Sequence, residues 1–160
     1  MRAVVAFAAL AAVAWGAYAW WPSEERRIRR RIETLENVLN EQPKTGLDLV
    51  TRAGQLATFF EPDVVLDPGG GAGPIVGRER LVALAARAPN AGGAIAVRFV
   101  DVFANLDGAR AIVRMTATIS WLDARGEENV DAREVELEMR KTDDWRIRRI
   151  AAVDAIEKPR

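Results

Sequence analysis

The chain has 160 residues, of which 49% are hydrophobic and 29% charged, and its 23 Lys and Arg balance 23 Asp and Glu. This length allows one domain with a short appendage, and the balanced charge argues against a basic nucleic-acid binder or a disordered acidic chain. The sequence has no Cys and no His, which excludes thiolate metal sites and removes the commonest general base. The composition therefore allows a packed core and predicts no metal, no cofactor and no nucleic-acid partner.

Residues 3–21 form an uncharged, apolar stretch of nineteen residues. As a helix rising about 1.5 Å per residue, this stretch would span about 28 Å, close to the hydrocarbon thickness of a bilayer. Trp20 and Trp21 stand at its end, where such side chains favour the headgroup region. Residues 1–22 are therefore predicted to be a membrane anchor that contacts lipid through residues 3–21. The small-x-small pattern at residues 17–19 supports a second interpretation, a secretory signal that is cleaved.

Five arginines between positions 26 and 31 follow this segment. They are either a solvated helix face or a contact with anionic lipid headgroups. The positive-inside bias favours a cytoplasmic location for this side, whereas a short positive amino-terminal end is also typical of exported proteins. The sequence thus leaves the side of the membrane open. Residues 22–160 carry 22 positive and 23 negative side chains, a net charge of −1.

Residues 23–160 are predicted to form one domain that begins with three amphipathic helices. Apolar residues at i, i+4, i+7 and i+11 predict a helix that Ser23 caps and Pro43 ends. The same spacing recurs between Gly46 and Pro62, and a shorter helix is expected over about residues 78–87. The residues expected to face inward on these helices are Ile28, Ile32, Leu35, Leu39, Leu49, Ala53, Leu56, Phe60, Leu81, Leu84 and Ala85.

A short strand over residues 63–67 precedes the glycine-rich stretch PGGGAGPIVG. A phosphate loop needs Gly-x-x-x-x-Gly-Lys-Ser/Thr, and a dinucleotide fingerprint needs Gly-x-Gly-x-x-Gly. The stretch has neither spacing. It is therefore interpreted as a flexible hairpin connection.

After Pro89 the apolar period changes from 3.6 to 2, and turn signals at residues 107–108, 123–126 and 142–144 predict four antiparallel strands. The faces expected to meet the helices carry Ile95, Val97, Phe99, Phe103, Val135, Leu137, Met139, Trp145, Ile147, Ala151 and Val153. The opposite face is either a solubilising surface or a dimer interface. It is expected to carry Arg98, Arg110, Arg114, Glu134, Glu136, Glu138, Arg146 and Arg148, with Ile112, Ile150 and Ile156.

Three motifs stand in this order of elements: FFEPDVVLDP at residues 59–68, GRERL at 77–81 and DWRIRRIAAVDAI at 144–156. With these motifs, residues 23–156 approximately resemble the nuclear transport factor 2-like superfamily, which includes SnoaL-type polyketide cyclases and ketosteroid isomerases. The resemblance implies an α+β cone, with three helices packed on a curved, mainly antiparallel sheet around a pocket. The pocket wall is then expected to include Leu35, Leu56, Phe60, Phe99, Val135 and Trp145.

Isomerase relatives place a general-base Asp before a Pro after the first strand, and Asp67-Pro68 resembles that pair. The alternative is that Asp67 caps the turn before Pro68. The resemblance also implies an oxyanion site made by a Tyr of the first helix and a protonated acid on a later strand. Here Tyr18 is the only Tyr and the strand position falls near Val135. Steroid isomerisation by that route is therefore not expected.

Asp101 and Arg149 are charged residues at positions whose strand neighbours are expected to face inward. Because an isolated buried charge costs several kcal/mol, they are predicted to form a buried ion pair. The alternative is that they line the pocket and that Arg149 selects a polar or anionic ligand.

Three functions fit these observations. The first is a membrane-anchored module that binds a small apolar ligand or a protein without catalysis. The second is a lyase or isomerase acting on a small apolar substrate with Asp67 as base. The third is a dimeric scaffold in which side chains fill the pocket and the outer sheet face mediates dimerisation.

Overall fold

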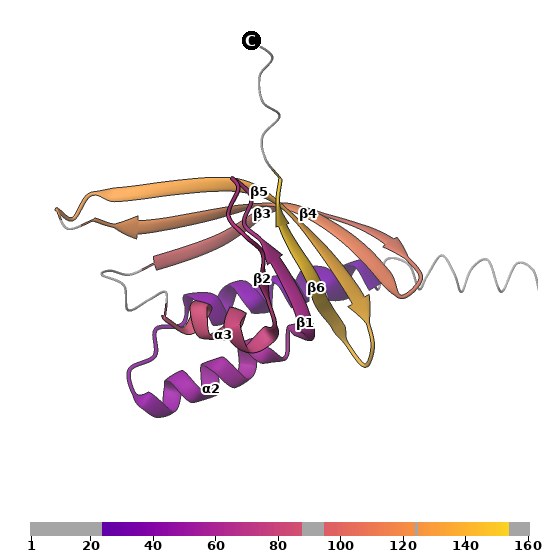
Figure 1. Ribbon diagram of the computed structural model, residues 1–160, viewed down its shortest axis with the longest axis horizontal. Helices are drawn as coiled ribbons and strands as arrows, with labels where there is room; N and C mark the ends of the chain where they lie inside the picture. Colours follow the sequence, from indigo (N-terminus) through magenta and orange to yellow (C-terminus); the bar gives the residue numbers. More distant parts are fainter. Residues whose placement is uncertain (1–23, 88–94, 124, 154–160) are drawn as a thin grey trace, which may run out of the picture.

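The computed structural model describes residues 24–87, 95–123 and 125–153 (Figure 1). Six strands form one mixed sheet in the order β2-β1-β6-β5-β4-β3, and the helices lie on one side of it. All neighbouring strands are antiparallel except β1 and β6, which are parallel. Residues 24–40 are helical, and the later elements are α2 (Gly46–Ala57), β1 (Phe60–Asp67), β2 (Ile75–Val76), α3 (Arg78–Arg87), β3 (Ile95–Asp107), β4 (Arg110–Leu122), β5 (Glu128–Lys141) and β6 (Trp145–Ala152). The predicted α+β architecture, three helices on a mainly antiparallel sheet, is confirmed.

The predicted membrane segment and the predicted cap Ser23 lie outside the described residues. Within residues 24–87, 95–123 and 125–153, no helix has the length and apolar character needed to cross a membrane.

The second helix is shorter than its apolar spacing predicts. A capping box fixes its start, because the Thr45 side chain accepts a hydrogen bond from the Asp48 backbone N–H at 3.2 Å and the Asp48 carboxylate accepts one from the Thr45 N–H at 2.9 Å. The helix ends at Ala57, so Phe60 begins β1 instead of closing the helical stripe. On α3, Leu81 is buried as expected, but Leu84 is 49% exposed and Val82 takes the inward place.

The glycine-rich stretch connects two antiparallel strands, as predicted. Ile75 pairs with Leu66, which makes β2 the edge of the sheet beside β1. Gly69, Gly70 and Gly71 have φ angles of 70°, 61° and 79°, a region that favours glycine.

A β-bulge on β3 changes which side chains face the helices. Val100 pairs with Thr116 and Phe103 pairs with Arg114, so residues 101 and 102 together oppose one residue of β4. Asp101 has a φ of 54° at this point. Beyond the bulge Leu106 is buried, whereas Phe103 is 68% exposed on the other face. The prediction that Phe103 faces inward is therefore wrong, because the bulge shifts the period by one residue.

A second irregularity on β6 has the same effect. Met139 pairs with Ile147, but Glu138 pairs with Arg149, so Arg148 is the extra residue. Beyond this point Ile150 pairs with buried Leu137 and packs against the core. Three apolar residues change face as a result: Ile150 faces inward, and Ala151 and Val153 lie on the outer side. Ile156 lies outside the described residues.

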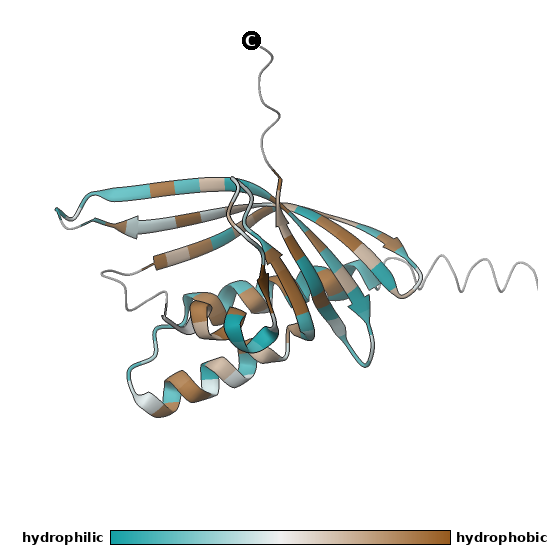
Figure 2. Ribbon diagram, viewed as in Figure 1, coloured by the Kyte–Doolittle hydropathy of each residue, from teal (hydrophilic) through white to brown (hydrophobic). Residues whose placement is uncertain are grey.

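The hydrophobic core fills the space between the helices and the inner sheet face. Figure 2 shows apolar and polar residues alternating along the strands, as expected of a sheet with one buried face. Buried residues of the first helix, including Ile28 at 0% and Ile32 at 2% exposure, join the sheet residues Val113 at 0% and Leu137 at 2% in one cluster.

The first helix also protects the edge strand β3. The Asn40 amide accepts a hydrogen bond from the Val97 N–H and donates one to the Val97 carbonyl, each at 2.7 Å. The Glu36 carboxylate accepts a hydrogen bond from the Phe99 N–H at 2.6 Å. Because these backbone groups are satisfied by the helix, this part of the edge cannot recruit another strand.

Candidate functional site

The six residues predicted to line a pocket come together in the hydrophobic core. Leu35, Leu56, Phe60 and Trp145 are at most 5% exposed, and Phe99 and Val135 are partly buried against the same cluster. Their apolar surfaces are therefore covered by one another and by neighbouring side chains. This part of the inner face belongs to the core that holds the fold together.

Asp67 lies on the outer face of the sheet. Val64 is fully buried and Leu66 packs against the core, so Asp67, one residue further along β1, points away from the helices. One carboxylate oxygen accepts a hydrogen bond from the Gly69 N–H at 3.2 Å, and the other lies 3.6 Å from Nη2 of Arg149. This geometry is that of a turn-capping residue with an ion-pair partner.

Asp101 and Arg149 do not form the predicted buried pair. Asp101 is on β3 and Arg149 is on β6, and β4 and β5 lie between these strands. Both residues are exposed, and Arg149 is also 3.6 Å from a carboxylate oxygen of Glu138. The bulges explain the error, because each charge stands at or beside an extra residue that turns it toward solvent.

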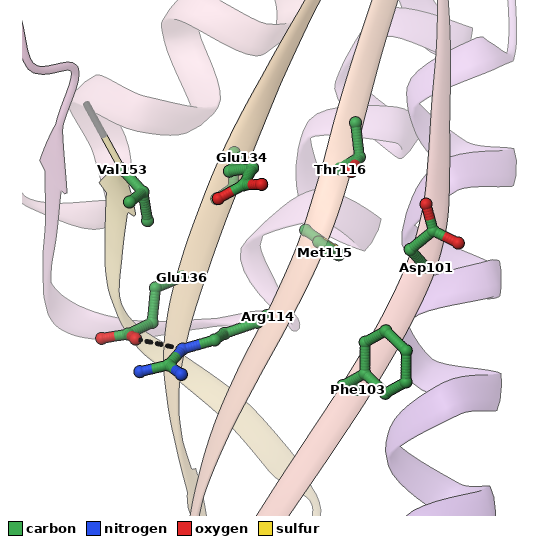
Figure 3. Close-up of a pocket in the computed structure, with 9 residues that line it drawn as sticks. Asp101, Phe103, Arg114, Met115, Thr116, Glu134, Glu136 and Val153 are labelled. Carbon is green, nitrogen blue, oxygen red and sulfur yellow. Dashed lines mark hydrogen bonds and ion pairs between the residues drawn. The ribbon is translucent and has the colours of Figure 1, made fainter. Parts of the chain in front are cut away.

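The outer face carries a hollow of about 520 Å³ across β3, β4 and β5 (Figure 3). Within its lining, Nε of Arg114 donates a hydrogen bond to a Glu136 carboxylate oxygen at 2.9 Å. Two exposed apolar side chains stand at its borders, Phe103 at 68% and Val153 at 43% exposure. The complete lining is Asp101, Phe103, Arg114, Met115, Thr116, Glu134, Val135, Glu136 and Val153.

The hollow combines apolar and charged side chains on the outer face of the sheet. It places exposed apolar side chains around an accessible ion pair whose Arg114 side chain is 75% exposed. Aromatic side chains and arginine are enriched at protein interfaces. Within the described part of the chain, no group of three or more acidic residues is arranged to hold a metal ion.

The sequence pattern predicted the wrong face for Phe103 and Val153. The charged residue inside each apolar run is the signal that could have corrected this prediction.

Glu24 is a buried carboxylate that the sequence gives no reason to expect. Trp145 Nε1 donates to it at 3.0 Å, Lys141 Nζ lies 2.9 Å away, and Arg27 donates at 3.0 Å. Burial raises the pKa of Glu24, but the hydrogen bonds from Lys141 and Trp145 and the nearby positive charges outweigh it and lower the pKa overall. This group ties the start of the first helix to the turn between β5 and β6.

Residues 46–151 match the model of the SnoaL-like domain family. The chain belongs to the SnoaL-like domain family. The match begins at α2, continues through α3 and all the strands, and stops one residue before the end of β6. The SnoaL-like assignment confirms the resemblance drawn from the sequence.

Solved structures share the fold of this SnoaL-like domain at low sequence identity. A nuclear transport factor 2-like protein with a cystatin-like fold from Novosphingobium aromaticivorans is 19% identical, covers 88% of each chain and has a TM-score of 0.68. A putative aromatic ring hydroxylase from the same organism is 16% identical over 85% of this chain and 91% of its own, with a TM-score of 0.67. Its putative scytalone dehydratase is 13% identical over 85% and 90%, with a TM-score of 0.63. No curated protein matches the sequence.

Proposed function

We propose that this chain is a membrane-anchored SnoaL-like module that works by protein interaction and not by catalysis. The observation that carries the proposal is the contrast between the tightly packed central part of the inner face and the hollowed outer face. Four of the expected pocket-wall residues are at most 5% exposed, whereas the outer face carries a hollow of about 520 Å³ with exposed Phe103 at its border. The expected base Asp67 lies on this outer face and is engaged in an ion pair.

The partner that best fits this hollow is a second copy of the chain. Arg114 and Glu136 are opposite each other on adjacent strands, and both are accessible. In a two-fold interface the same surface patch of both copies is in contact. Arg114 of one copy can therefore pair with Glu136 of the other, and Glu136 of the first with Arg114 of the second. The exposed apolar residues Phe103, Ile112 and Val153 would then be buried around this pair.

The membrane anchor stays a prediction from residues 3–21, as does the division into residues 1–22 and 23–160. An anchor would help a weak interface, because tethering two copies to one surface raises their effective concentration.

Light scattering on residues 23–160 over a range of concentrations tests the interface. The buried core residues lie between Ile28 and Ile147, so this part of the chain contains the whole cluster. We expect the molar mass to rise toward that of a dimer, and Phe103→Asp to abolish the rise. Leu47→Asp is the matched control, since Leu47 is 75% exposed on α2, away from the sheet face. A monomer at every concentration, or equal effects of both substitutions, would contradict the proposal.

A small apolar ligand is a second candidate, supported by the distal part of the inner face. Ile119 and Trp121 share this face with partly buried Phe99 and are 40% and 38% exposed. Aromatic and apolar side chains that converge in this way are typical of ligand sites. Binding of a hydrophobic fluorescent probe should decrease in Trp121→Ser and not in Leu47→Ser if this surface takes a ligand.

The enzymatic alternative uses Asp67 as base on a small apolar substrate. Its support is the family itself together with a similar structure that is named a putative scytalone dehydratase. Asp67→Asn would abolish turnover in such an enzyme and leave a binding module unchanged.

A further inference from the structure

Three arginines form a row across the outer sheet face, about four residues along β4 from the hollow. Arg110 on β4 is directly opposite Arg140 on β5, and Arg140 is directly opposite Arg146 on β6. Like charges in directly opposed positions destabilise a sheet. Three arginines in directly opposed positions therefore cost stability. Residues that cost stability in this way are found most often at functional sites.

Acidic residues neutralise this row only in part. Glu61 lies 3.5 Å from Arg140, and Asp107 continues the row on β3 opposite Arg110. A fourth arginine, Arg148, lines the same small hollow of about 160 Å³ as Arg110, Arg140 and Glu138. Glu138 is already paired with Arg149. Arg110, Arg140, Arg146 and Arg148 thus have Glu61 and Asp107 as the acidic neighbours that remain, which leaves this surface positive.

The arginine row is accessible. Arg110 is exposed, the Arg140 side chain keeps 42% of its surface in solvent, and Arg146 is half-buried. The neighbouring Arg148 is exposed as well. Within the described residues, the ion pair between Arg140 and Glu61 is the one that involves the row. The guanidinium groups are thus able to donate to an external anion.

The row lies beside the point where the chain would leave a membrane. Lys141 and Trp145 flank the row in sequence, and both hold the buried Glu24 carboxylate. Glu24 is two residues after Pro22, which ends the apolar segment. If residues 3–21 span a bilayer, Glu24 keeps the turn between β5 and β6 close to its surface.

We propose that Arg110, Arg140, Arg146 and Arg148 bind the phosphate groups of anionic phospholipids in the membrane that holds residues 3–21. The planar guanidinium donates two parallel hydrogen bonds to a phosphate group. A row of arginines is therefore better suited to phosphate groups than a single positive charge is. The proposal rests on the anchor described above. It fixes the orientation of the domain, with the arginine row toward the lipid and the 520 Å³ hollow further out and free for a partner.

The test uses the full chain, whose lack of Cys permits a single introduced label. A spin label at Thr142→Cys reports on the exposed turn beside the row, and one at Glu127→Cys reports on the exposed turn at the opposite end of β5. The chain is reconstituted in vesicles of phosphatidylcholine alone and of phosphatidylcholine with one quarter phosphatidylglycerol. Vesicle flotation measures insertion, and label accessibility to lipid-dissolved oxygen and to an aqueous nickel chelate measures approach to the surface.

We expect flotation with both compositions, with the Thr142 label shifting toward oxygen and away from nickel only in anionic vesicles. The Glu127 label should not shift. The variant R110Q/R146Q/R148Q should lose the Thr142 shift, whereas R98Q/R125Q/R133Q, which removes the same charge elsewhere, should keep it. Flotation with equal label signals in both lipids, or equal loss in both variants, would overturn the arginine contact and leave the anchor standing. Failure to float with either lipid would overturn the anchor and this proposal with it.

Discussion

The two faces of the sheet have opposite properties although the same strands build them. The inner face carries Val113, Leu137 and Ile147, each at most 2% exposed, and its role is to stabilise the fold. The outer face carries Phe103 at 68% exposure and an ion pair between Arg114 and Glu136. Alternation along the strands therefore gives one sheet a face that holds the domain together and a face whose apolar and charged side chains stay accessible. Substitutions on the inner face should therefore lower the free energy of unfolding, and substitutions on the outer face should affect association with a partner.

Substitutions on the inner face should cost the most stability. Trp145→Ala removes a side chain that is 1% exposed and a donor to Glu24, so unfolding should become easier by about 3–5 kcal/mol. Phe103→Ala on the outer face should change monomer stability by no more than about 0.5 kcal/mol. Urea denaturation of both variants at neutral pH measures the contrast, and similar losses would show that Phe103 belongs to the core.

Glu24→Gln should cause the next-largest loss of stability, about 1–3 kcal/mol, because it removes the buried carboxylate charge that lies 2.9 Å from Lys141 Nζ. The pKa of Glu24 is lowered from its ordinary 4.5, so the carboxylate stabilises the fold above that value and the contribution is lost as the pH falls through the lowered pKa. The stability difference between wild type and Glu24→Gln should thus be constant at neutral pH and shrink below about pH 4.5. A difference that grows on acidification would contradict this assignment.

The bulge on β3 predicts a smaller effect. Asp101 has a φ of 54°, where a β-branched residue costs about 1–2 kcal/mol and glycine costs little. Asp101→Val should therefore destabilise the domain, and Asp101→Gly should leave its stability unchanged or slightly higher. Thermal denaturation distinguishes them, and equal melting temperatures for the two variants would argue against a bulge here.

The smallest effect is expected for Asp67→Asn. Its contact with Arg149 is a 3.6 Å ion pair between partly exposed side chains, which contributes less than about 1 kcal/mol. Stability and self-association should both stay close to wild type in denaturation and light-scattering measurements. A large gain in stability would instead indicate that Asp67 is a strained, functional carboxylate.

Periodicity predicted the fold well because the helical stripes and the alternating strands depend on local spacing. The helix over residues 78–87 and the hairpin at the glycines follow from the sequence directly. The faces of β3 and β6 were predicted wrongly beyond each bulge, because a bulge inserts one residue and reverses the side-chain alternation that follows it. Asp101 and Arg149 stood out as charges inside apolar runs, and that irregularity signalled a shift in register and not a buried pair. The Glu24 contact with Lys141 joins residues far apart in the chain, which no spacing rule reaches.

Charge reversal of the Arg114–Glu136 pair shows whether the outer face joins two copies of the chain. Arg114→Glu and Glu136→Arg should each make residues 23–160 monomeric in light scattering, because like charges would meet across the two-fold interface. An equimolar mixture of the two variants should associate again, since the carboxylate introduced at position 114 of one variant would meet the guanidinium introduced at position 136 of the other. A wild-type chain that is monomeric at all concentrations, or a mixture that stays monomeric, would contradict an interface built on this face.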